Sequence, residues 1–148
     1  MTILTSLHGS LLGLTKQGNI EGANGNQVTA PAVNADITVS AEDTNVRDIT
    51  IQLKDAHGND ITSRQVVQAF VFADANGNAF ATTGGSTGIE IGTDGALLAL
   101  VAKKAFILIS EDDGDIDLTW TDTGTEAAYL GILLPSGRLI ISDALTNA

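Results

Sequence analysis

The stretch DIDLTWT, residues 115–121, decides the fold because its apolar and polar residues alternate without a break. Successive side chains of a β-strand point to opposite faces, so Ile116, Leu118 and Trp120 share one face of an extended chain. The aspartates and threonines occupy the other face. We therefore predict a strand that buries one face and exposes the other, and we expect Trp120 to be buried.

Similar segments lie on both sides of this stretch. DITIQLK (48–54) alternates in the same way, whereas QVVQAFVFA (65–73) and AFILIS (105–110) are apolar on both faces. A strand of the second kind belongs in the middle of a sheet or against another subunit. AAYLGILL and GRLIIS follow, joined by a Pro-Ser-Gly turn. ALLALVAKKA (96–105) fits a short helix or a strand and turn equally well.

Short strands separated by turns every eight to twelve residues predict a mainly β protein, an antiparallel β-sandwich of immunoglobulin-like type. A β-barrel is the alternative. All six aromatic residues lie between positions 70 and 129. Because aromatic side chains supply much of the buried area of a core, we place the β-sandwich domain at residues 45–148. Residues 1–44 are then an extended N-terminal arm, with one small hairpin around the Lys-Gln-Gly-Asn turn at 16–19.

Composition excludes several classes of protein. The 148 residues carry a net charge of −11, which disfavours nucleic acid as a partner. The sequence has no cysteine, which excludes disulfides, a thiolate nucleophile and thiolate metal ligands. No run approaches the roughly 20 apolar residues that span a bilayer, so we expect no membrane partner. The first residues lack a basic leader, which predicts synthesis in the cytoplasm.

Two similar acidic motifs, DAHGN (55–59) and DANGN (74–78), could each be part of a calcium-binding loop. An EF-hand loop needs a glycine at position 6 and a glutamate at position 12. Counted from Asp74 these positions hold Ala79 and Gly85, and counted from Asp55 the twelfth position is Val66. Asp, Asn and Gly are also the residues of chain reversals. We therefore interpret both motifs as turns.

SEDDGDIDL (110–118) is the stronger candidate for a metal site, since carboxylates lie on both sides of Gly114 in the sequence. The alternative is an exposed hairpin tip, which we favour because strand alternation separates neighbouring acids. We predict no metal site and no cofactor.

Catalytic signals are weak. His8 and His57 have no adjacent nucleophile in a triad context, and the glycine-rich TGGSTGIEIG (83–92) lacks a phosphate-loop pattern and is expected to be a flexible loop. We expect no enzyme activity; a metal-dependent enzyme on a β-scaffold is the alternative that elemental analysis would test.

Three stretches together resemble small structural proteins of tailed bacteriophages: HGSLLGLTKQGNI (8–20), ITIQLKDAHGND (49–60) and the run from ALLALVAKKAFILIS to LLPSGRLIIS (96–142). This resemblance implies a virion component, either a capsid decoration (cement) protein or, alternatively, a head-fibre or tail-associated module that adheres to the host cell. For a decoration protein it implies the major capsid protein as partner and the capsid exterior as location. It carries over no catalytic residue.

An arm joined to a compact acidic domain suits a subunit that binds a lattice and packs against copies of itself, and we favour a homotrimer. We expect the arm to dock through Leu11, Leu12, Leu14 and Ile20, with nearby glycines allowing a close backbone approach. The alternative is that these residues cover the core of their own domain.

Overall fold

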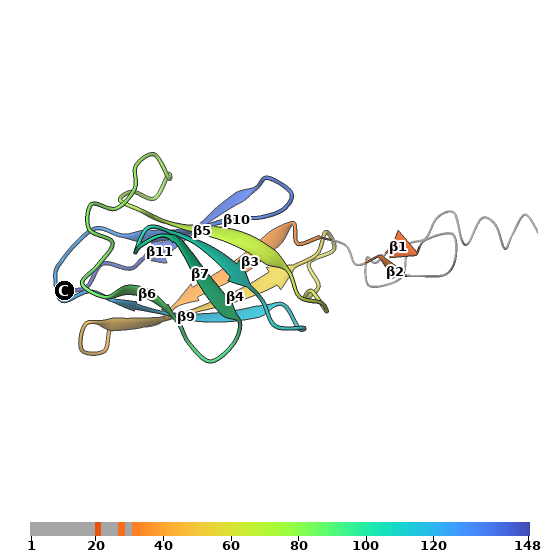
Figure 1. Ribbon diagram of the computed structural model, residues 1–148, viewed down its shortest axis with the longest axis horizontal. Coiled ribbons are helices and arrows are strands. Elements are labelled where there is room, and N and C mark those ends of the chain that lie inside the picture. Colours follow the sequence, from red (N-terminus) through yellow and green to blue (C-terminus); the bar gives the residue numbers. More distant parts are fainter. Residues whose placement is uncertain (1–19, 22–26, 29–30) are drawn as a thin grey trace, which may run out of the picture.

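The computed structural model describes residues 20–21, 27–28 and 31–148. Among these residues every regular element is a strand (Figure 1). The strands are β1 (Ile20–Glu21), β2 (Gln27–Val28), β3 (Asn34–Val39), β4 (Val46–Lys54), β5 (Val66–Phe72), β6 (Gly88–Ile91), β7 (Ala96–Val101), β8 (Ala105–Ile109), β9 (Asp115–Thr121), β10 (Tyr129–Leu133) and β11 (Leu139–Ala144).

Nine of these strands form two antiparallel sheets that face one another across a common core (Figure 1). One sheet has five strands in the order β11-β10-β5-β8-β7, and the other has four in the order β3-β4-β9-β6. The edge strands β11 and β3 lie beside each other on one side of the sandwich, and β6 and β7 lie on the other. The predicted immunoglobulin-like antiparallel β-sandwich is therefore confirmed.

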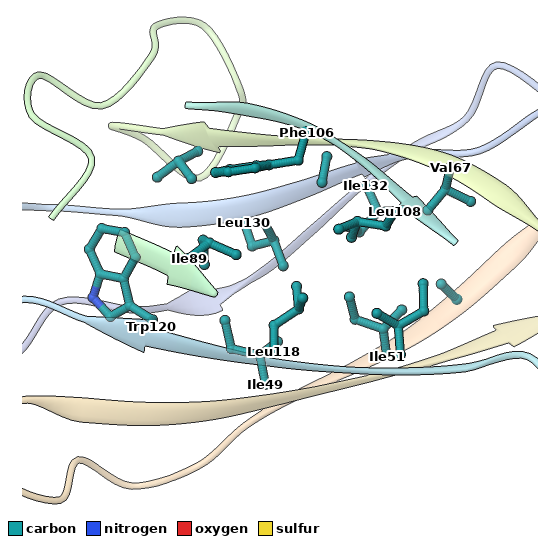
Figure 2. Close-up of a cluster of buried hydrophobic side chains, with 14 of the residues drawn as sticks. Ile49, Ile51, Val67, Ile89, Phe106, Leu108, Leu118, Trp120, Leu130 and Ile132 are labelled. Carbon is teal, nitrogen blue, oxygen red and sulfur yellow. The ribbon is translucent and has the colours of Figure 1, made fainter. Parts of the chain in front are cut away.

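Side chains from the inner faces of both sheets fill the space between them (Figure 2). In β9, Ile116, Leu118 and Trp120 are buried, and the residues between them remain partly exposed, as the alternation predicts. Leu108 and Leu130 from the five-stranded sheet belong to the same cluster. Burying this many aliphatic side chains supplies most of the driving force for folding, at about 25 cal/mol per Å² of apolar surface.

The domain boundary predicted at residue 44 is wrong, because β3 belongs to the sandwich. Its six residues pair with β4 from Asn34 opposite Lys54 to Val39 opposite Ile49. Ala32 and Ala35 are already buried in the core. The prediction failed because it equated the packed domain with the aromatic residues, whereas the core-facing residues of β3 are Ala35, Ile37 and Val39.

Most of the predicted arm lies outside the described residues. This includes Leu11, Leu12 and Leu14, as well as the turn predicted at residues 16–19. Ile20 belongs to β1, which pairs antiparallel with β2 so that Ile20 is opposite Val28. This pairing of residues 20–21 with 27–28 is not the hairpin predicted around residues 16–19, which lies mostly outside the described residues.

The segment 96–105 resolves as a strand and a turn. β7 pairs with β8 from Ala96 opposite Ile109 onward, and a bulge interrupts the register between Ala99 and Val101. The turn that follows places Lys103 at a φ of 63°, which is unusual for a residue with a side chain. Within the described part of the chain, no helix is long and apolar enough to cross a membrane.

Candidate functional site

The two outward surfaces of the sandwich differ in chemistry. On the four-stranded sheet, the positions that point away from the core carry Asp36, Asp48, Glu90, Asp115 and Asp117, with Lys54 as their basic neighbour. On the five-stranded sheet, the corresponding positions of β5, β7, β8 and β10 carry no charge. We call this surface the apolar face; its residues are Val66, Gln68, Phe70, Phe72, Ala96, Leu98, Ala105, Ile107, Ile109, Tyr129, Gly131 and Leu133.

The central strand β5 shows how the apolar face arises. Val67, Ala69 and Val71 are buried in the core, so the residues between them must point outward. Val66 is 56% exposed, and Pro135 with Leu133 and Ile107 lines a shallow depression beside it. Both faces of β5 are apolar, as its sequence predicts, and the strand lies in the middle of its sheet. Contiguous exposed apolar surface of this kind commonly marks an interaction site.

An aromatic cluster occupies one part of the apolar face. The rings of Phe70 and Phe72 lie 6.0 Å apart, and Phe72 stacks on Phe80 at 5.7 Å with an interplanar angle of 11°. Phe80 is nevertheless 54% exposed. The loop after β5 reaches across β10 to β11, because a Cβ atom at Gly77 would lie 3.2 Å from Leu139 and Ile141 of β11. This loop covers the β10–β11 side and leaves the β5–β8–β7 side open.

The two similar acidic motifs, at residues 55–59 and 74–78, are turns, as predicted. The Asp55 carboxylate accepts hydrogen bonds from the backbone N–H groups of His57 at 2.8 Å and Asn59 at 2.9 Å. Asp74 accepts equivalent bonds from Asn76 and Asn78. Burial raises the pKa of Asp55, but the bonds from Asn59 and His57 outweigh it and lower the pKa overall. Each carboxylate therefore satisfies the donors of its own turn.

The acidic stretch 111–117 is not a hairpin tip, because β8 and β9 belong to different sheets and the stretch connects them. Arg64 pairs with Glu111 at 2.8 Å and with Asp112 at 3.2 Å. Partial burial raises the pKa of Asp115, and the neighbouring Asp117 raises it further. Across residues 31–148, no group of three or more acidic or histidine side chains is arranged to hold a metal ion.

The histidines do not form a site in the described structure. His57 lies in the first Asp-Ala turn, and His8 lies outside the described residues.

The glycine-rich loop at 83–88 is held in place by Glu126. Its carboxylate accepts bonds from the backbone N–H groups of Thr83 at 2.8 Å, Gly84 at 3.0 Å and Gly85 at 3.1 Å, and from the Thr83 hydroxyl. Burial raises the pKa of Glu126, but these bonds dominate and lower it to about 2. Successive N–H groups of this kind bind anions, and here a side chain of the same chain occupies them. The segment 83–92, expected to be a loop throughout, thus begins with residues bonded to Glu126 and ends in the strand β6 (Gly88–Ile91).

The sequence did not reveal this interaction because Glu126 lies about forty residues after the loop that it binds. Of the docking residues predicted from sequence, Ile20 is in β1, and Leu11, Leu12 and Leu14 lie outside the described residues, so their docking stays a prediction. The feature that the sequence did indicate is the two-faced apolar character of β5 and β8.

Fold and surface together define a β-sandwich module with one charged and one apolar outer face. No protein-family model matches the chain. No curated protein matches it either. Among solved structures, it is similar to a cohesin module from a Clostridium perfringens family 33 glycoside hydrolase. The match covers 78% of this chain and 93% of that one, with 15% identity and a TM-score of 0.37. A likeness of that size carries no argument about function.

Proposed function

We propose that this chain is a structural protein of a phage virion, and specifically a capsid decoration (cement) protein that binds the outer surface of the head and stabilises it. The specific assignment rests on the resemblance of residues 8–20, 49–60 and 96–142 to small phage structural proteins. The acidic composition adds to it, because a protein with a charge of −11 avoids non-specific binding to DNA before assembly.

The observation that supports an assembly role is the apolar face. A protein with eighteen acidic residues has none at the outward positions of four adjacent strands. Covering this surface with another protein removes apolar area from water, which favours association. The charged face on the opposite side of the sandwich stays in solvent. This division suits a subunit that lies on a protein shell.

In the proposed mechanism, two parts of the chain contact the shell. Leu11, Leu12, Leu14 and Ile20 dock on the major capsid protein, and the apolar face lies against the shell or a neighbouring copy. Linking two contacts within one chain raises the overall affinity well above that of either contact alone. Repeated around the head, such contacts resist outward pressure. The proposed role is mechanical and needs no catalytic residue or cofactor.

A head-fibre or tail-associated module that adheres to the host surface is the second candidate. The observation in its favour is the exposed ring of Phe80, stacked on Phe72 at 5.7 Å. Exposed aromatic rings provide apolar surface with a preferred stacking geometry, which a sugar ring can also use.

The deciding experiment measures binding of the full chain to purified phage heads that lack it. Val66→Lys places a charge on the apolar face, and Asp48→Lys makes the matched change on the charged face. A third variant replaces Leu11, Leu12, Leu14 and Ile20 with serine. We expect Val66→Lys and the serine variant to lower the affinity at least tenfold and Asp48→Lys to leave it unchanged.

Saturating binding to isolated host cells or their polysaccharide, with no binding to heads, would reject the decoration role in favour of the adhesion module. Binding to neither would reject both candidates.

A further inference from the structure

The depression in the apolar face lies at the end of the sandwich where β5 begins. Val66, Ile107, Leu133 and Pro135 line it, together with Gln68 and two core residues, and its volume is about 230 Å³. None of the residues that line it is charged. Val66 is 56% exposed, so the described residues leave this apolar surface open to solvent.

The chain enters the sandwich at the same end. The backbone N–H of Val33 donates a hydrogen bond to the carbonyl of Lys54 at 3.0 Å, and Lys54 is the last residue of β4. Residues 55–65 then lead from β4 into β5. Figure 1 shows the start of β5 and the β10–β11 turn at the end where the chain enters β3. The segment that precedes β3 therefore begins its path near the depression.

This segment is long enough to reach the depression. Because Ile20 pairs with Val28, the connections that matter run from Leu14 to Ile20 and from Val28 to Pro31, which are six and three residue steps. Extended chain covers about 3.3 Å per residue, so these steps reach about 30 Å. β3 lies beside β11, and only β10 separates β11 from β5. At about 10 Å between sheets and about 4.8 Å between strands, the path is about 20 Å long.

The chemistry of the segment also fits the depression. Leu11, Leu12 and Leu14 are three apolar residues within four positions. All eighteen acidic residues of the chain lie at or after Glu21, whereas Lys16 lies before it. The segment therefore brings no carboxylate to an apolar surface, where a buried charge would be costly. Its positive charge is also attracted to an acidic domain.

Tethering favours the segment of the same chain over that of a second copy. A short flexible connection that spans its two sites gives an effective concentration on the order of millimolar. The segment of a second copy competes equally only when the protein itself is that concentrated.

We propose that Leu11, Leu12 and Leu14 cover the depression at Val66 on their own apolar face while the chain is free in solution. On a support, the segment and the face exchange this contact for contacts with another protein. Free copies then do not present both apolar surfaces at once. The consequence for shell binding rests on the proposed function, whereas the contact within the free chain does not.

Because the chain has no cysteine, disulfide cross-linking of the full chain is a direct test. Val66→Cys is combined with Leu12→Cys, and in separate variants with Leu11→Cys or Leu14→Cys. Asp36→Cys is the matched control for Val66→Cys: the Asp36 side chain is 68% exposed and closer to the segment along the chain, but it lies on the charged face. With oxidised glutathione, we expect the intramolecular disulfide to form at least tenfold faster with Val66→Cys.

Mass spectrometry of the unreduced monomer identifies the bonded pair. Equal rates with Val66→Cys and Asp36→Cys would reveal random encounters of a tethered segment and would overturn the inference, as would the absence of an intramolecular bond. Covalent dimers whose yield rises with protein concentration would assign the depression to a second copy instead.

Trypsin cleavage after Lys16 gives an independent measurement, because a covered segment is cut only when it is released. Val66→Lys should speed this cleavage at least threefold. Thr50→Lys adds the same charge at an exposed position of the charged face and should leave the rate unchanged. Equal rates in the wild type and both variants would contradict the inference, and thermal melting checks that each variant is folded. These measurements involve no phage heads, so their outcome is independent of the proposed function.

Discussion

The ring of Phe72 lies directly over Gly131 on the adjacent strand. The two residues lie on neighbouring antiparallel strands, and a Cβ atom at Gly131 would come within 2.8 Å of ring atom Cδ2 and closer still to Cε2. Real Cβ atoms essentially never approach a neighbour so closely. The missing side chain at Gly131 therefore leaves the space that the Phe72 ring occupies.

Replacing Gly131 with alanine should destabilise the fold by about 1–3 kcal/mol, because the ring of Phe72 must move from its stacked position on Phe80. Gly124→Ala is the matched control, since its added Cβ would meet only Asp122 at an ordinary 3.5 Å. Urea unfolding of both variants measures the difference. Equal stability of the two would show that the ring has room to move at no cost.

Trp120 should have a blue-shifted fluorescence maximum, because its side chain is fully buried in the core (Figure 2). Trp120→Ala should cost about 3–5 kcal/mol of stability through the cavity that it leaves. The indole Nε1 has no hydrogen-bond partner in the described structure. Trp120→Phe should therefore cost less than the alanine change, since it also removes a buried donor. An emission maximum typical of tryptophan in water would contradict the burial.

The interaction of Glu126 with the glycine-rich loop should make the stability of the fold depend on pH. The pKa of Glu126 is about 2 in the folded protein, below its ordinary value of 4.5, so the carboxylate stabilises the fold above pH 4.5. This contribution is lost as the pH falls from 4.5 towards 2. Allowing for solvent screening, it is on the order of 1 kcal/mol at neutral pH.

Glu126→Gln tests this assignment, because the amide has a similar shape but no negative charge. The variant should be less stable than the wild type at pH 7, and the two stabilities should converge near pH 2. Chemical denaturation at several pH values gives both curves. A stability difference that does not change with pH would assign the interaction to shape alone.

The two Asp-Ala turns should respond differently to the same substitution. Asp55 is buried and its carboxylate accepts two part-buried hydrogen bonds from backbone N–H groups, so Asp55→Ala should cost about 1–3 kcal/mol. Asp74 is more exposed, and water can replace its carboxylate, so Asp74→Ala should cost less. Melting temperatures of both variants provide the comparison.

Calcium should leave the melting temperature of the wild type unchanged, and so should a chelator. A rise of several degrees on adding calcium, reversed by EDTA, would instead show a bound ion.

The sequence predicts the strands whose apolar residues alternate or continue on both faces. β9 and β4 have clean two-residue periods, and β5 and β8 have apolar residues on both faces, so their type and their place in the sandwich follow from pattern alone. The sequence of β7 has no periodicity that distinguishes a strand from a helix, and its pairing with β8 makes it a strand. β3 was missed because small residues give a weaker signal than aromatic rings.

The apolar face could be predicted from the sequence only in part. The outward residues of β5 and β8 are visible as an excess of apolar character, which indicates a partner. Their combination with Leu98 and Leu133 depends on the strand order β10-β5-β8-β7, and local patterns do not specify it. The bonds from the glycine-rich loop to Glu126 likewise depend on a long-range approach. Sequence patterns fix which face of a strand is apolar, whereas the topology decides which faces meet.

The unequal outer faces of the sandwich give the molecule a direction as well as a shape. Asp36, Asp48, Glu90 and Asp117 lie on the side opposite the apolar face. If many copies attach to a support by the apolar side, their carboxylates form a continuous negative layer at its outer boundary. The coated object would move faster towards the anode than the bare one and would repel similarly coated neighbours at low salt, within a Debye length of about 10 Å at 0.1 M. The protein would then determine the colloidal behaviour of whatever it covers.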